Sequence, residues 1–250
     1  MFFFMSGHSK WANIKHKKAA ADSKKGKVFT RMAKLITVAA QQGGGDPDTN
    51  PTLRVAIQKA KSAGVPNDNI ERAVKKGTGE LKGDRLEEVI YEGYGPEGVA
   101  ILILALTDNT NRSLTNVRTI MTKNHGNLGG SGCVAWMFER KGIIEADKVT
   151  IDHDAFELEL IDAGADDVFW EGAAVRVQTS PEAFEQCLKV FNNLPVQKSE
   201  ISLVPQEEKE VNDVQKGKEI VHLIELLEDD EDVDEVFTNA SFSESVLKSL

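Results

Sequence analysis

The first eighty residues carry apolar side chains with the period of an α-helix. Between Ser23 and Gln42 apolar residues recur every three or four positions, which predicts a helix with one buried face. That face consists of Phe29, Met32, Leu35, Ile36 and Ala39. A second stripe on the same helix is basic and consists of Lys24, Lys27, Arg31 and Lys34. Because the two stripes centre more than about 90° apart, burying the apolar stripe leaves the basic one in water.

Two more helices are predicted from their start and stop signals. Asn50 followed by Pro51 is typical of a helix start, and the helix that begins there is predicted to end at Gly64. The next helix is predicted to be capped by Asp68, with Glu71 three residues later as in a capping box.

Beyond residue 80 the pattern changes from helices alone to alternating strands and helices. A short helix at 11–21 completes a helical domain of residues 5–80 before that change. The later elements are predicted as strands at 86–94 and 99–106 joined by a hairpin, a helix at 111–125, strands at 132–138 and 142–146, a helix at 152–163, strands at 167–170 and 174–178, a helix at 181–192, a strand at 199–204, a helix at 214–227 and a strand at 233–238.

Part of this order is that of a ferredoxin-like domain. From residue 142 to residue 204 the elements run β-α-β-β-α-β, which is the split-βαβ order. The helix and strand that follow return most simply to the sheet begun at residue 86. The predicted fold class is therefore α+β with three domains, a small N-terminal helical domain followed by two α/β ferredoxin-like domains, the third inserted in the second. Their predicted bounds are 5–80, 81–139 plus 206–240, and 140–205.

The charge of the chain is divided unevenly. Residues 1–80 contain fifteen Lys and Arg against six Asp and Glu, a net charge of +9, and the rest contains 15 against 34, a net charge of −19. The whole-chain charge of −10 hides this division. Such asymmetry is typical of a protein whose basic part binds nucleic acid or another anionic surface.

The positive charge is most concentrated in GHSKWANIKHKKAAADSKKGK, residues 7–27, which has seven lysines and one acid. Lysines bind phosphates, and an aromatic or imidazole ring among them can stack on a base or sugar. The predicted nucleic-acid-binding residues are Lys10, Trp11, Lys15, His16, Lys17, Lys18, Lys24, Lys25, Lys27 and Arg31. Two alternatives stay open, a lysine face that is only solvated and a Trp11 that anchors the helical core. No base-reading motif such as a zinc finger is evident, which favours backbone and shape recognition.

The other motifs do not predict an enzyme. GYGPEG at 93–98 has the G-x-G-x-x-G spacing, but a strand follows it, so a hairpin is expected. The Gly-rich segment 125–133 is expected to be a connection, with a minor nucleic-acid contact by nearby basic residues as the alternative. The acidic run 225–235 is expected to be a solvated face. Cys133 and Cys187 are expected to be buried thiols, and no metal, cofactor or small-molecule substrate is expected.

Four long segments occur in an order that is specific to one family. They are MSGHSKWANIKHKKAAADSKKGKVFTRMAKLI (5–36), GGGDPDTNPTLRVAIQKAKSAGVPNDNIERAVKKGTGE (43–80), YEGYGPEGVAILILALTDNTNRS (91–113) and GNLGGSGCVAWMFERKG (126–142). On these segments the chain resembles the YebC family, also called the YebC/PmpR family, whose mitochondrial relative is the translational activator of cytochrome c oxidase. The resemblance spans residues 5–237 and implies a helical domain followed by two α/β domains. Cys133 stands where many members have Ser.

The resemblance also implies a role in gene expression that is not enzymatic. Members are described as cytoplasmic DNA-binding transcriptional regulators, and others as ribosome-associated factors that help synthesis through consecutive prolines. We therefore predict a cytoplasmic DNA-binding transcriptional regulatory protein, with a translation factor that binds ribosomal RNA or tRNA as the alternative. A third possibility is an enzyme that acts on anionic metabolites through the Gly-rich segments. No membrane partner is expected, because no apolar run approaches about 18 residues.

Overall fold

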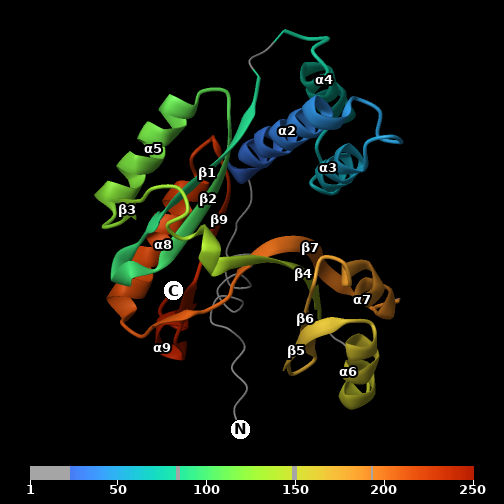
Figure 1. Ribbon diagram of the computed structural model, residues 1–250, viewed down its shortest axis with the longest axis vertical. Coiled ribbons are helices and arrows are strands. Elements are labelled where there is room, and N and C mark those ends of the chain that lie inside the picture. Colours follow the sequence, from blue (N-terminus) through green and yellow to red (C-terminus); the bar gives the residue numbers. More distant parts are fainter. Residues whose placement is uncertain (1–22, 83–84, 148–150, 193) are drawn as a thin grey trace. The chain divides into compact units, whose positions relative to one another are not determined.

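The computed structural model describes residues 23–82, 85–147, 151–192 and 194–250, and it begins with three helices (Figure 1). They are α2 (Ser23–Gly43), α3 (Pro51–Ser62) and α4 (Asn67–Gly77). Each of them coincides with a helix that the apolar pattern predicts. The short helix predicted at 11–21 lies outside the described residues.

These three helices enclose a small apolar core. Ile36 of α2, Leu53 of α3 and Ala73 of α4 are at most 5% exposed and belong to one cluster. Helix α2 approaches α4 so closely that a Cβ atom at Gly77 would clash with the carbonyl oxygen of Thr37. Backbone cannot move away as a side chain could, so the packing of these two helices requires glycine at this position.

Asn50 fixes the turn between α2 and α3. Its side chain is buried, and its Oδ1 accepts a hydrogen bond from the backbone N–H of Leu53 at 3.0 Å. Its Nδ2 donates to the carbonyl oxygens of Ala39 at 2.8 Å and Gly44 at 2.9 Å. The predicted helix start at Asn50 is therefore confirmed, and the same side chain also satisfies carbonyl groups at the end of α2.

Replacing Asn50 by Ala is expected to lower the free energy of unfolding by about 2 kcal/mol. The substitution removes the cap of α3 and leaves buried carbonyl oxygens without their donor. Chemical denaturation of the full chain, followed by circular dichroism, measures the difference. Asn69→Ala, at an exposed position of α4, is the matched control and should change the free energy by less than about 0.5 kcal/mol. Equal stability of the two variants would contradict the capping role.

The first sheet has four antiparallel strands in the order β3-β1-β2-β9 (Figure 1). Its elements are β1 (Glu87–Tyr94), β2 (Ala100–Thr107), α5 (Thr110–Lys123), β3 (Asn127–Leu128), α8 (Val214–Glu228) and β9 (Val233–Thr238). The predicted hairpin between β1 and β2 is confirmed, and its turn is the 3-10 helix η1 (Pro96–Gly98). Helix α5 packs closely on one face of the sheet, since a Cβ atom at Gly93 of β1 would touch Met121 of α5.

The second sheet has four antiparallel strands in the order β5-β6-β4-β7. Its elements are β4 (Phe138–Ala146), α6 (His153–Asp162), β5 (Ala165–Glu171), β6 (Ala174–Thr179), α7 (Phe184–Val190) and β7 (Val196–Pro205). The two helices and the sheet share a core that includes Ile144, Leu160 and Cys187. Element order and strand order together are those of a ferredoxin-like domain, so this prediction is confirmed.

Two sequence predictions of local structure are wrong. Asp68 does not cap α4, because Pro66 precedes the helix and no side chain bonds there. Asp68 lies instead in the first turn of α4, where its negative charge interacts favourably with the positive end of the helix dipole. Residues 132–138 do not form a strand, since η2 (Ala135–Met137) is a 3-10 helix and β4 begins only at Phe138. Two backbone amides of this segment are bound by a carboxylate rather than by a neighbouring strand.

The second sheet is inserted in the first, because β4 to β7 come between β3 and the pair α8–β9 in the chain. The predicted class, α+β with a helical part followed by two antiparallel sheets, is confirmed. Four short elements were not predicted from the sequence. They are β3, the parallel pair β8 (Lys209–Val211) and β10 (Ala240–Phe242), and α9 (Glu244–Leu247). The described residues up to 134 form one compact unit with 213–238, and 135–212 form the other with 239–250. The predicted domain bounds stay a prediction.

Candidate nucleic-acid interface

The predicted nucleic-acid-binding residues lie mostly at or beyond the edge of the described chain. Six of them, Lys10, Trp11, Lys15, His16, Lys17 and Lys18, lie outside the described residues. Lys24 and Lys25 lie in the first turn of α2, where the structure describes only the helix. Lys27 and Arg31 are thus the two predicted residues whose side chains are placed.

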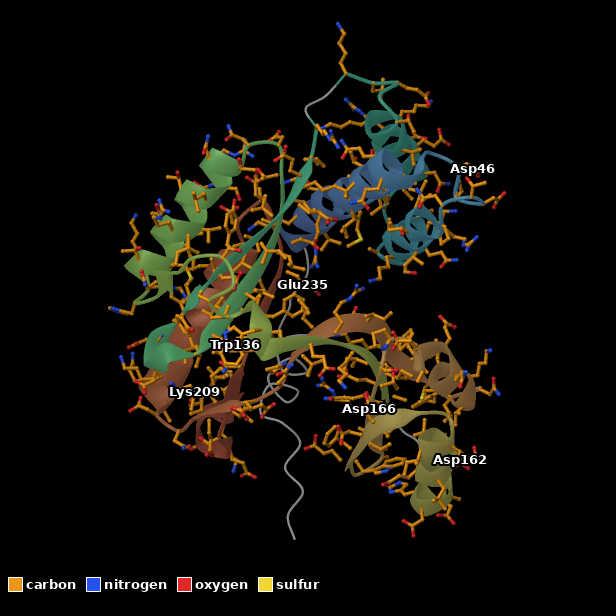
Figure 2. The ribbon with its side chains drawn as sticks, viewed as in Figure 1. Asp46, Trp136, Asp162, Asp166, Lys209 and Glu235 are labelled. Atoms are coloured by element: carbon orange, nitrogen blue, oxygen red, sulfur yellow. The ribbon has the colours of Figure 1, made fainter. Side chains whose placement is uncertain are left out.

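Both of these side chains contact the acidic run near the C-terminal end. Lys27 Nζ lies 2.8 Å from Asp229 Oδ1, and Arg31 Nε lies 2.6 Å from Asp234 Oδ1. Arg31 Nη2 lies 3.9 Å from Oε1 of Glu235, which is labelled in Figure 2. Burial alone would lower the pKa of the Arg31 guanidinium, but Asp234 and Glu235 outweigh it and raise the pKa above its ordinary value.

Lys34, the last cation of the basic stripe, contacts a buried carboxylate. Lys34 Nζ donates to Asp232 Oδ1 at 2.9 Å and to the carbonyl oxygens of Glu231 at 2.7 Å and Leu106 at 3.0 Å. Arg112 of α5 binds the same carboxylate, with Nη2 at 2.8 Å and Nε at 3.2 Å from Oδ2. The Asp232 side chain is only 4% exposed. One carboxylate therefore ties α2 and α5 to the segment that leads into β9.

The pKa of Asp232 reflects this arrangement. Burial alone would raise the pKa of the carboxyl, but the hydrogen bonds from Arg112 and Lys34 outweigh it and hold the pKa below its ordinary value. The expectation that the acidic run is a solvated face is wrong here, because Asp232 is buried and Asp234 is largely so. The run is the partner of the basic stripe on α2.

Further cations lie exposed on α3 and α4. They include Arg54 and Lys61 on α3 and Arg72 and Lys75 on α4. None of these four forms an ion pair with another residue of the described part of the chain. Each pair lies along one side of its helix, since the spacings are seven and three residues. The sequence prediction missed these residues, although their helical spacing was an available signal.

The Gly-rich segment is held by the protein's own groups. Glu92 of β1 is buried and accepts hydrogen bonds from the backbone amides of Gly132 at 2.6 Å and Val134 at 2.8 Å. The amide of Gly129 donates to the Glu92 carbonyl oxygen, and the Tyr94 hydroxyl donates to the carbonyl oxygen of Cys133. Amides that would have to face a bound phosphate are occupied by a carboxylate, which favours a structural connection here.

The described residues offer little chemistry beyond charge. Within the ranges that the structure covers, no group of three His, Cys, Asp or Glu side chains could hold a metal ion. Across the same ranges, no helix is both long and apolar enough to span a bilayer. Cys187 is buried, as expected, and burial raises the pKa of its thiol, whereas Cys133 is only half-buried.

Two family models match this chain, one over its helical part and one over the two sheets. The model for the second and third domains of TACO1/YebC proteins matches residues 86–240, and the model for the N-terminal domain of the same proteins matches residues 9–80. The chain belongs to the TACO1/YebC family. The resemblance inferred from the four sequence segments is thereby confirmed.

Individual proteins are similar to this chain over nearly its whole length. A protein of Natranaerobius thermophilus is 49% identical over 98% of this chain and 100% of its own, and one of Halothermothrix orenii is 47% identical over 98% and 99%. Both bear the name "Probable transcriptional regulatory protein". The crystal structure of a conserved hypothetical protein from Aquifex aeolicus has a TM-score of 0.81 at 42% identity, covering 94% of this chain and 97% of its own.

Proposed function

We propose that this chain is a nucleic-acid-binding regulator of gene expression that acts through its cationic helical domain. The observation that carries the proposal is the separation of charge, +9 in residues 1–80 against −19 in the rest. Helices α3 and α4 together hold six Lys and Arg against two Asp and Glu. The names of the similar proteins point to transcription, which makes DNA the first candidate partner.

Binding is proposed to rest on phosphate contacts. Lys10, Lys15, Lys17, Lys18, Lys24 and Lys25 supply the charge, and Trp11 and His16 assist by stacking on a base or sugar. Lys27 and Arg31 join them only where a phosphate takes the place of Asp229 or Asp234. The exposed cations of α3 and α4 supply further phosphate contacts. The acidic remainder of the chain repels nucleic acid, which limits binding to the helical domain.

Each proposed contact is to the sugar-phosphate backbone, so affinity is expected to depend more on salt than on sequence. A cytoplasmic setting is part of the proposal, since chromosomal DNA and ribosomes of a bacterial cell both lie there.

Crosslinking in living cells tests the proposal and identifies the polymer. A photoreactive amino acid replaces Val55, which is 50% exposed on α3 beside Arg54, in the full chain. The matched control places it at Ile201, which is 42% exposed on β7. DNA is expected from position 55 and not from position 201. Ribosomal RNA or tRNA at position 55 would replace the transcriptional role by the translational one, and no nucleic acid at that position would refute the proposal.

A further inference from the structure

Helix α6 of the second sheet carries apolar side chains on two opposite sides. Phe156 is 5% exposed and Leu160 is fully buried, and both belong to the core under the sheet. Leu158 is 62% exposed and Ile161 is 53% exposed. At about 3.6 residues per turn, the exposed pair points away from the core that the buried pair fills.

Exposed apolar side chains are concentrated in this segment of the chain. Ile151, just before α6, is 39% exposed, so three of the nine large exposed apolar residues of the described chain lie within eleven positions. Ala155 is also exposed and lies on the same side of α6 as Leu158. Single exposed apolar residues are ordinary on a protein surface, but several on one helix face mark a contact with another molecule.

Acidic side chains outnumber basic ones on α6 and in the residues that follow it. Residues 151–192 contain ten Asp and Glu against two Lys and Arg. Asp154, Glu159 and Asp162 are exposed on α6 itself, and Figure 2 shows Asp162 at the end of this helix. Nucleic acids and anionic lipid surfaces are repelled by this excess of negative charge, whereas a cationic partner is attracted. Charge and apolarity together specify what the face accepts.

We propose that α6 is a docking surface for a Lys/Arg-rich amphipathic segment of a partner protein. Leu158 and Ile161, with Ala155 and Ile151, contact the apolar side of that segment. Asp154, Glu159 and Asp162 pair with its cations. The inference goes beyond nucleic-acid binding, since it gives the acidic part of the chain a protein partner, and it does not depend on the helical domain.

Titration of the full chain with a labelled synthetic helix of Leu and Lys residues tests the chemistry of this surface. Leu158→Ser with Ile161→Ser is expected to weaken binding at least about tenfold, because both anchors of the contact are lost. Asp154→Asn with Asp162→Asn is expected to weaken binding and to reduce its dependence on salt. A peptide in which Glu replaces each Lys should not bind.

Two control variants test whether binding depends on this face or only on exposed apolar residues and net charge anywhere on the protein. Val55→Ser with Ile201→Ser removes exposed apolar side chains elsewhere and should leave the affinity unchanged. Glu207→Gln with Glu208→Gln, at exposed positions, makes the same change of net charge as the Asn pair and should have less effect. Absence of binding, or equal losses in test and control variants, would overturn the proposal. A concentration-dependent dimer that Leu158→Ser abolishes would overturn it in favour of a second copy of this chain.

Discussion

Replacing Lys15, Lys17 and Lys18 by Glu is expected to weaken nucleic-acid binding about a hundredfold at about 0.15 M salt. Each lysine that neutralises a phosphate releases a counterion, and each such contact adds about 0.9 to the slope of log K against log salt on duplex DNA. Losing three contacts should flatten that slope by about 3. The measurement is a salt titration of the full chain with one DNA duplex and one RNA hairpin.

A charge-matched variant separates this segment from the net charge of the whole chain. Lys189→Glu, Lys209→Glu and Lys218→Glu change the charge by the same amount at exposed positions of the acidic part. This control should bind almost as the natural chain does, because residual long-range repulsion is screened over about 8–10 Å. Unchanged affinity in the Lys15, Lys17 and Lys18 variant would contradict the proposed interface. Equal losses in both variants would show that only net charge matters.

Replacing Asp232 by Ala is expected to lower the free energy of unfolding by about 3 kcal/mol. The buried carboxylate is bound by Lys34 and Arg112 together, and its removal leaves the Lys34 ammonium, which is only 19% exposed, without its counter-charge. Thermal or chemical unfolding of the full chain measures the loss. Asp229→Ala is the matched control from the same acidic run. The Asp229 side chain is 60% exposed, and water weakens its ion pair with Lys27. Removing it should therefore lower the free energy of unfolding by less than about 0.5 kcal/mol.

The same carboxylate predicts a pH dependence with a definite sign. Its pKa is lowered in the folded chain, so its contribution is fully present above the unfolded value of about 3.9 and is lost as pH falls through the folded value. The difference in stability between the natural chain and Asp232→Asn should therefore be constant near neutral pH and shrink below about pH 4. A difference that grows on acidification would contradict the assignment.

Sequence pattern predicted the elements whose signals are local. The apolar spacing from Phe29 to Ala39 placed α2, because a helix buries one face. Asn50 with Pro51 placed the start of α3, because the first amides of a helix need an acceptor just before it. The strand predicted at 132–138 failed because Glu92, forty residues earlier in the chain, binds the amide of Gly132. No window of neighbouring residues contains that contact.

The pairing of the basic stripe with the acidic run could not be predicted from the sequence for the same reason. The charges of Lys27 and of the acidic run were both visible in the sequence, but either could have faced water. Only the pairing of β9 with β2 brings Asp232 and Asp234 to α2. Charge counts predicted that residues 1–80 and the rest of the chain have net charges of opposite sign. The fold decides which cations neutralise which carboxylates.

The ion pairs between α2 and the acidic run can form only late in the synthesis of the chain. Arg31 and Asp234 are separated by 203 residues, and at about 5–20 residues per second roughly 10–40 s of synthesis pass between them. Throughout that interval the basic stripe exists without its carboxylates, and β2 lacks the edge strand β9. The unfinished chain therefore lacks the carboxylates that neutralise Lys27, Arg31 and Lys34, and the basic stripe is open to other anions until β9 has been made.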